Sequence, residues 1–527
     1  MLRKHLPILL VLALGLALRI AGIFWGEVDR SSGVVLEPDE FQHVALAADY
    51  VKQWGGKSGQ DIPYRFWNTR AYGFQLGGLL YIAEKIGYPL SYHTKQAMVG
   101  RFLSTFYGIM LVLLLYHFCL FLFQDRIVAT MAATFMAIFD LPITYAHYAL
   151  PAAPYLFWAH AAVFTMIRYY YHFNGGRPLK RLWSLELFLS LAIAMSFGLK
   201  FDFLVIAMLG ICLLTLIIQS RISLVQGFIR GGLILLSSVF FFGIIHAFSF
   251  GWADIRYAFG LLQSFNQNAI PVDQHWLHNP LLYLLGIMAG TSIWILLASA
   301  WGTFQLVFSP AKEADSRPGL LLLLVFILLE FGIRWYIDTP FIRRVNVFLP
   351  FCAIISAMVF YQWSQRSFWW AKMVFPIVAL YTLGLSIYGQ NNFWHDTRYK
   401  ALSILQAQPL NGNVYYSTYA KIPGMPETTT DDPATAQHLI VHETYYARYW
   451  KFFTTPFKQP QCCDEVYNCG GESLCSFYQD LLSGQTEFEL IHHIKTQHPF
   501  PERRLFKYWL GTYETFLGDL RIYTRRQ

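Results

Sequence analysis

Two adjacent carboxylates and a histidine follow the first apolar segment of the chain, in the stretch Glu37-Pro38-Asp39-Glu40-Phe41-Gln42-His43. Proline is favoured in the first turn of a helix, and carboxylates are stabilised there by free N–H groups and the helix dipole. We therefore predict a helix that begins at Pro38 and assign Asp39 and Glu40 a catalytic role as an acid pair at a membrane surface. A plain helix cap is the alternative. The spacings of three and four that predict an amphipathic helix are those of Phe41, Val44, Ala45, Ala48 and Val51.

A second set of polar residues lies at the ends of later apolar segments. Ionisable groups at membrane depth usually face a cavity and one another. Each also has a simpler explanation, because Arg101 could reach lipid head groups, His147 could be a packed core residue and Arg343 could belong to a solvated loop. Together they predict a ring of charge on one side of the membrane. The members are Arg101, Tyr145, His147, Lys200, Asp202, Arg334, Arg343 and Arg344.

An anionic phosphate suits this ring. Arginine donates two hydrogen bonds to a phosphate in a fixed geometry, and lysine adds a point charge. An attacking hydroxyl needs a base within hydrogen-bond reach, and a departing phosphate needs cations. This combination predicts sugar transfer from a lipid phosphate to a hydroxyl, with inversion at the anomeric carbon if one base acts in a single displacement. We assign phosphate binding to Arg344, Arg343, Lys200 and Arg101, and substrate binding to His43, His147 and Tyr145.

The composition is that of a membrane protein with many spans. Of the 527 residues, 55% are hydrophobic and 14% are charged, whereas about 25% are charged in a soluble domain. The apolar residues fall in blocks of about 17 to 25, the length needed to cross a bilayer. We predict an α-helical polytopic fold and retain the first block as a span rather than a signal peptide. The net charge of +8 is no indication of nucleic acid binding.

About eleven spans are expected, so the two chain ends should lie on opposite faces of the membrane. Basic residues number about 13 in the predicted short inner loops and about 5 in the outer ones, which places the N-terminus inside. The acid pair and the C-terminal part then face outward together. Two long outer loops result, 26–96, with an interfacial apolar stretch at 74–86, and 251–279. The spans are expected near 6–24, 97–123, 127–148, 151–172, 182–199, 202–219, 228–250, 280–307, 318–336, 344–362 and 369–388.

From about residue 391 the chain reads as a small α+β domain, 391–527, after a membrane domain of residues 1–390. Strands are expected at 414–416 and 438–441, and helices at 401–407 and 477–482. Four cysteines crowd into this part, with a spacing that fits no standard zinc site. If this part of the chain lies on the outer face of the membrane, disulfide bonds fit the four cysteines better than a zinc site does. The disulfide candidates are Cys462, Cys463, Cys469 and Cys475, whereas Cys119, Cys212 and Cys352 lie singly in apolar segments.

Several short motifs, in this order and on these faces, resemble the GT-C superfamily of integral-membrane glycosyltransferases. The chain is most similar to the bacterial branch related to protein O-mannosyltransferases and lipid A aminoarabinose transferases. The stretch Pro38-Asp39-Glu40-Phe41-Gln42 also resembles the start of eukaryotic GPI and lipid-linked-oligosaccharide mannosyltransferases, which share this architecture. The motifs are Pro38-Asp39-Glu40, Arg101-Phe102-Leu103-Ser104, Pro142 to His147, Gly198-Leu199-Lys200, Arg344 to Pro350, Asp396-Thr397-Arg398 and Leu520-Arg521-Ile522-Tyr523.

The resemblance implies a polyprenyl-phosphate-linked sugar as donor and a hydroxyl-bearing acceptor, which can be a glycolipid, a glycan or a protein. It also implies an active site on the outer face of a bacterial inner membrane, with Asp39 as base. One feature departs from the family, because the turn 147–154 lacks the acid that many members carry there. Asp140 lies seven residues before His147, too far along the chain to take the place of the missing acid. The sequence shows no cofactor-binding pattern. It contains no motif that supports a divalent metal, so metal dependence stays an open question.

Two other classes of protein explain only part of this pattern. A polytopic transporter or lipid flippase with a charged outward cavity would explain many spans and buried charges. Transporters often carry related halves, and no internal repeat is visible here. A transporter also needs neither a long first outer loop nor a large outer domain. A receptor or scaffold leaves the ring of charge unexplained.

Overall fold

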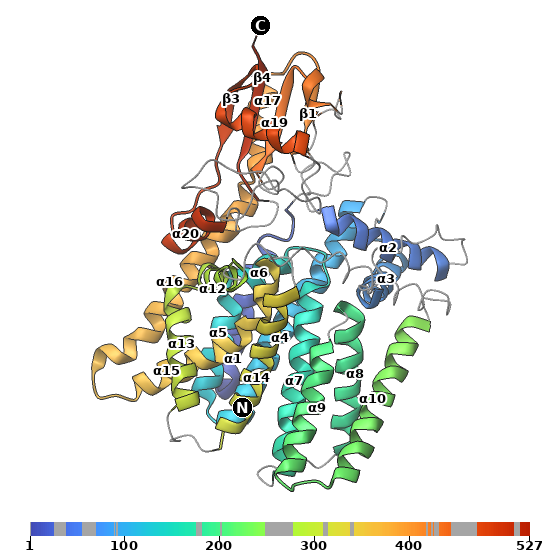
Figure 1. Cartoon of the computed structure of the whole chain (residues 1–527), viewed down its shortest axis with the longest axis vertical. Helices are drawn as coiled ribbons and strands as arrows, with labels where there is room; N and C mark the ends of the chain where they lie inside the picture. Colours follow the sequence, from blue (N-terminus) through green and yellow to red (C-terminus); the bar gives the residue numbers. More distant parts are fainter. Residues whose placement is uncertain are drawn as a thin grey trace.

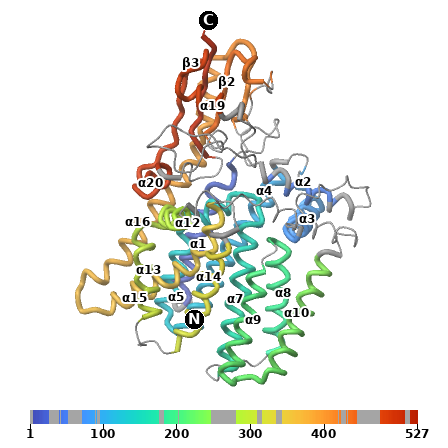
Figure 2. The backbone as a smooth tube through the Cα atoms, viewed as in Figure 1, coloured from blue at the N-terminus to red at the C-terminus, as the bar shows by residue number. Residues whose placement is uncertain are grey.

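The computed structural model consists of a helical bundle with a small sheet above one end (Figure 1). The end of β4 lies at the top of the view and the start of α1 in the lower half of the bundle, as Figure 2 also shows. The structure describes residues 2–25, 38–54, 70–88, 90, 93–174, 182–200, 203–247, 278–308, 315–337, 342–417, 420–422, 425, 430, 432–443, 472–510 and 517–526.

Each of the eleven predicted apolar blocks coincides with helical structure in the bundle. Among the described residues, five helices are long and apolar enough to cross a membrane, or seven if each of two bent pairs counts as one span. The count of eleven therefore stays a prediction. The helices are α1 (Leu2–Ile20), α4 (His93–Phe123), α5 (Arg126–Ile138), α6 (Asp140–Ala146), α7 (Ala152–Phe173), α8 (Leu182–Lys200), α9 (Phe203–Ile218), α10 (Leu224–Ala247), α12 (His278–Gly290), α13 (Ile293–Phe308), α14 (Arg317–Ile337), η3 (Ile342–Phe348), α15 (Leu349–Ser364) and α16 (Trp369–Trp394).

The segment 127–148, predicted as one span, is broken at Phe139, where α5 and α6 meet at 56°. Pro142 explains the break, since a proline ring clashes with the carbonyl four residues earlier, here that of Ile138. That carbonyl accepts a hydrogen bond from Ser386 instead. Arg19 donates to the neighbouring carbonyls of Met136 and Ala137, at 3.4 and 3.0 Å. The break thus leaves no described carbonyl of 136–138 without a donor.

The segment 280–307 is also broken, because α12 and α13 meet at 119° across Thr291 and Ser292. Thr291 donates its hydroxyl to the carbonyl of Ile287 at 2.7 Å, which ends α12. Ser292 accepts from the N–H of Ile295 at 3.3 Å and caps α13. Serine and threonine that bond to the backbone in this way compete with a continuous helix.

Two helices between α1 and α4 lie across the upper end of the bundle, α2 (Pro38–Trp54) and α3 (Arg70–Lys85) (Figure 1). The start of α2 at Pro38 is as predicted. Its buried residues include the polar Glu40, His43 and Asp49 beside Val44, Leu46 and Ala47, so the inner face is not the purely apolar stripe that was predicted. The reason is that Glu40 has an ion-pair partner inside the bundle, so a charged residue defines the inner face.

The C-terminal part contains a four-stranded sheet in the order β1-β2-β4-β3, with β1 and β2 parallel and the other pairs antiparallel. In β2, Leu439 and Val441 pack toward α19 while Ile440 packs toward α17, as the period of two requires. The predicted strands and helices are confirmed, and the boundary at 390 stays a prediction. The elements are α17 (Thr397–Ala407), β1 (Val414–Tyr416), η4 (Pro433–Thr435), β2 (His438–His442), α19 (Glu472–Ser483), β3 (Phe488–Ile494), α20 (Pro501–Leu510) and β4 (Leu520–Arg525).

Candidate active site

Glu40 is held in the bundle by a bidentate ion pair with Arg101 of α4. The guanidinium donates from Nε to Oε1 at 2.8 Å and from Nη2 to Oε2 at 2.7 Å. The backbone N–H of Ala149, after α6, donates to the same Oε1 at 2.6 Å. Both side chains of the pair are buried, so their charges are compensated by each other and by backbone groups. The first turn of α2 is therefore fixed against both α4 and the end of α6.

Arg101 also contacts the end of the first span. Its Nη1 donates to the carbonyl of Ile23 at 2.9 Å and to that of Trp25. The guanidinium lies 5.5 Å from the centre of the Trp25 ring, within the range of a cation–π interaction. The structure thus gives Arg101 protein partners, a carboxylate and two carbonyls, where the sequence suggested a donor phosphate.

Trp25 joins this pair to a second one in the C-terminal part. Its indole N–H donates to Asp396 at 3.0 Å, and Arg398 lies 5.5 Å from its ring centre. Asp396 and Arg398 form a buried ion pair at 2.7 Å. One tryptophan is thus in contact with two arginines, each paired with an acid. The motif Asp396-Thr397-Arg398 contributed to the family resemblance, but the sequence indicated neither this ion pair nor the role of Trp25.

Asp39 precedes Glu40 on α2, at the end of the helix nearest the bundle contact. The backbone of Asp39 belongs to the helix, whereas its side chain lies outside the described part of the structure. His43 is one turn further along, on the same side of the helix as Asp39 and Glu40. Its ring is buried and meets Tyr72 of α3 edge to face, with centroids 5.7 Å apart.

A narrow cavity in the bundle is lined by residues from α4, α5, α6, α7 and η3. Tyr145 of α6 and Asn346 of η3 both line it. The ring of Tyr145 packs edge to face on Tyr148 at 5.7 Å. The structure therefore brings the predicted substrate residue Tyr145 and the segment that carries Arg343 and Arg344 to one cavity.

His147 caps the end of α6 and is fully buried. It packs edge to face on Phe393, with centroids 5.2 Å apart. Gly22 faces its ring, and a Cβ at that position would lie 2.6 Å from it. A close fit of this kind makes His147 part of the wall between α1 and α6.

The remaining predicted cations come from η3 and α8. Arg343 and Arg344 are half-buried in η3. Lys200 ends α8 and lies 4.6 Å above the ring of Tyr155 in α7. The Tyr155 hydroxyl donates to the buried Glu330 of α14 at 3.4 Å, an acid inside an apolar helix that the sequence analysis did not select.

The structure does not describe two of the predicted charged side chains, most of one predicted loop and the four cysteine side chains of the C-terminal part. Asp202, the side chain of Arg334, most of loop 251–279 and the cysteines at 462, 463 and 469 lie outside the described residues, as does the side chain of Cys475. Cys119, Cys212 and Cys352 are buried free thiols. Within the described part of the chain, no three His, Cys, Asp or Glu side chains are placed to hold a metal.

Comparison with known protein families gives one match. Residues 73–254 match the family described as dolichyl-phosphate-mannose-protein mannosyltransferase. This segment begins in α3 and includes Arg101, Tyr145, His147 and Lys200. No curated protein sequence matches the chain.

Comparison with solved structures gives matches that include the following three. The archaeal oligosaccharyltransferase AglB from Archaeoglobus fulgidus, in complex with an inhibitory peptide and a dolichol-phosphate, has a TM-score of 0.54 and 12% identity over 99% of this chain and 89% of its own. ArnT from Cupriavidus metallidurans, bound to undecaprenyl phosphate, gives 0.47 and 11% over 76% and 72%. The S. cerevisiae Pmt1-Pmt2 complex, bound to the sugar donor, gives 0.37 and 18% over 47% and 33%.

The chain has the GT-C fold, since the likeness to AglB extends over almost its whole length. Together with the family match, this makes it a membrane glycosyltransferase of the GT-C type. The predicted fold class and the family resemblance are thus confirmed.

Proposed function

We propose that the chain transfers a sugar from a polyprenyl-phosphate donor to a hydroxyl acceptor at the outer face of the membrane. The family that matches residues 73–254 is described by a dolichyl-phosphate-linked mannose, which supports a donor of this chemical class. The positive-inside bias of the loops supports a cytoplasmic N-terminus and a periplasmic C-terminal sheet. A bacterial inner membrane is the proposed location.

In the proposed mechanism the Asp39 carboxylate accepts the proton of the acceptor hydroxyl. The hydroxyl oxygen attacks the anomeric carbon while the bond from that carbon to the phosphate oxygen breaks. The polyprenyl phosphate departs with the bonding electrons, and its charge is stabilised by Arg344, with Arg343 and Lys200 as the further proposed cations. A single displacement of this kind inverts the anomeric carbon.

The observation that carries the proposal is that Glu40 is buried and engaged by Arg101 and the Ala149 N–H, so it serves as an anchor for α2. Asp39 is the preceding residue in the first turn of the same helix. We assign Asp39 as the base, with Glu40 and Arg101 as its positioning pair and His43, Tyr145 and His147 as substrate contacts.

A detergent assay with a polyprenyl-phosphate mannose tests this function. The purified chain is mixed with the labelled donor and a glycolipid, glycan or peptide acceptor, and covalent product is detected by mass spectrometry. Transfer needs no sealed compartment, whereas transport across a membrane does. Labelled product in detergent supports the proposal, and donor movement in vesicles with no covalent product supports a transporter instead.

A further inference from the structure

Two consecutive residues of α20 reach into the two broken helices of the bundle. We propose that Glu502 and Arg503 are positioning residues for the active site, because they hold the ends of these helices in place. The inference rests on the proposed function for its activity readout. It adds a role for the C-terminal part that the transfer chemistry itself does not require.

Arg503 pairs with Asp140, the first residue of α6. Their Nη2 and Oδ2 atoms are 2.6 Å apart, and both side chains are fully buried. Gln390 of α16 donates to the other Asp140 oxygen at 2.8 Å. Gly389 leaves the space for this pair, since a Cβ there would overlap both Arg503 and Asp140. A charged residue from α20 thus fixes the point at which the span breaks.

Glu502 occupies the second break. Its carboxylate accepts the backbone N–H of Ile293, at the start of α13, at 3.3 Å. The Tyr381 hydroxyl donates to both carboxylate oxygens at 2.9 Å. A carboxylate at a helix N-terminus satisfies a free N–H group and is favoured by the dipole. Adjacent residues of one helix therefore stabilise two separate breaks.

Both breaks lead to candidate site residues. α6 carries Tyr145, which lines the cavity, and His147 caps the end of this helix. α12 packs closely on η3, because a Cβ at Gly286 would lie 2.7 Å from Val345. η3 is the segment of Arg343 and Arg344. Displacing α20 would therefore shift the predicted substrate wall and the predicted phosphate cations together.

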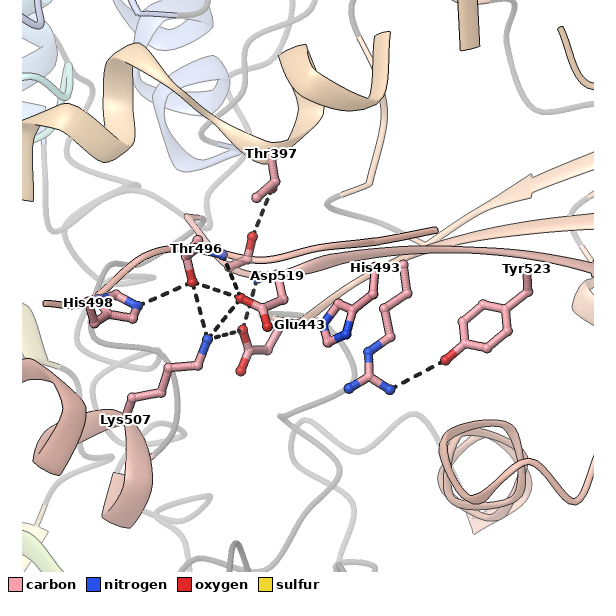
Figure 3. A network of polar contacts seen from close by, with 10 residues as sticks. Thr397, Glu443, His493, Thr496, His498, Lys507, Asp519 and Tyr523 are labelled. Atoms are coloured by element: carbon pink, nitrogen blue, oxygen red, sulfur yellow. Dashed lines mark hydrogen bonds and ion pairs between the residues drawn. The ribbon is translucent and has the colours of Figure 1, made fainter. Parts of the chain in front are cut away.

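The next turn of α20 is bound to the sheet (Figure 3). Lys507 donates to Glu443 at 3.0 Å and to Asp519 at 2.9 Å. Asp519 also accepts from Thr496. Lys507 thus holds α20 next to the sheet, and Glu502 and Arg503 hold it against the bundle. A movement of the sheet relative to the bundle would therefore displace the residues at both breaks.

The test measures kcat and donor KM of purified, monodisperse variants. Arg503→Met and Asp140→Asn should lower kcat/KM for the donor by at least about 10-fold, since small misplacements of reacting groups are costly. Arg503→Lys should recover part of this loss. Arg504→Met is the matched control, because Arg504 is the exposed neighbour on the same helix. Hydrogen exchange at 140–147 and 290–296 should rise in the first two variants and stay unchanged in the control.

A buried charge without its partner destabilises a fold, so a second variant keeps the charges balanced. Asp140→Arg combined with Arg503→Asp should restore folding, low exchange at both breaks and activity. A folded Arg503→Met enzyme with wild-type kcat and KM would overturn the positioning role. An exchanged pair that folds with low exchange at both breaks but remains as impaired as Arg503→Met would overturn it too. Absence of transfer by the wild-type enzyme would overturn the proposed function instead, while the exchange data would still report on the docking.

Discussion

Glu40 and Arg101 are 61 residues apart in sequence and form two parallel hydrogen bonds of 2.8 and 2.7 Å inside the bundle. This pair links α2 to α4. Because Trp25 contacts Arg101 and also Asp396, the link extends to the C-terminal part. The adjacent acid Asp39 is therefore presented by a scaffold that three distant segments hold together.

Loss of Arg101 should unfold this junction. Arg101→Met leaves Glu40 buried without its partner, so the unfolding free energy should fall by about 3–5 kcal/mol. Thermal unfolding of the detergent-solubilised protein measures this change. Arg126→Met, on the exposed start of α5, is the matched control and should leave the melting temperature unchanged. Equal melting temperatures for the two variants would remove the structural role of the pair.

Arg344 should matter for the donor rather than for the fold. A hydrogen bond to a charged group contributes about 1.5–3 kcal/mol, so Arg344→Ala should raise donor KM by roughly 10- to 100-fold. Steady-state kinetics with varied donor measure it. Arg366→Ala, an exposed arginine after α15, serves as control. A donor KM for Arg344→Ala equal to that of the control would count against phosphate binding.

The four tail cysteines should be oxidised. Cys462, Cys463, Cys469 and Cys475 are expected to resist a thiol reagent in the denatured protein until a reductant is added. Cys119, Cys212 and Cys352 are free thiols, so three labels per chain are expected before reduction and seven after it. Mass spectrometry counts the labels. Seven labels without reductant would refute the disulfides.

Acid should destabilise the C-terminal sheet through His442. Burial and, to a smaller extent, the charge of Arg398 lower the pKa of His442 to about 3. Its Nε2 also accepts the N–H of Gly518 at 3.3 Å. The folded-state pKa lies below the unfolded value of 6.5, so the unfolded chain binds more protons between these two pH values. Stability should therefore fall by about 1.4 kcal/mol per pH unit as pH drops below 6.5.

Melting temperatures of wild type and His442→Gln across pH 7.5 to 4 measure this dependence. The variant should lose less stability on acidification than the wild type. His395→Gln is the control, because His395 is exposed, and it should follow the wild-type curve. Parallel curves for all three proteins would contradict the assignment.

The sequence predicted the elements well where apolar periodicity or alternation decides the structure. The apolar blocks, the helix start at Pro38 and the strand of β2 follow from such patterns. The breaks at Phe139 and at Thr291 were not predicted, because the apolar composition continues through each of them. Pro142 was the available signal for the first break, and its effect depends on Ser386 and Arg19 satisfying the freed carbonyls.

The site was predictable only in part, for a related reason. Residue types selected Glu40, Arg101 and Tyr145 as polar groups near one face, but not which groups would bind one another. The ion pair with Arg101 buries Glu40 on the inner face of α2. The spacing of apolar residues cannot predict a buried charge of this kind. The partners Trp25, Asp140 and Arg503 depend on contacts between segments more than a hundred residues apart.

The most direct test of the central claim is transfer by Asp39→Asn in a purified assay, beside Glu84→Gln, an exposed acid of α3, as control. The account predicts that Asp39→Asn folds with the wild-type melting temperature and loses transfer by at least about 100-fold, the lower range for a general base. Near-normal turnover by the folded Asp39→Asn enzyme would contradict it.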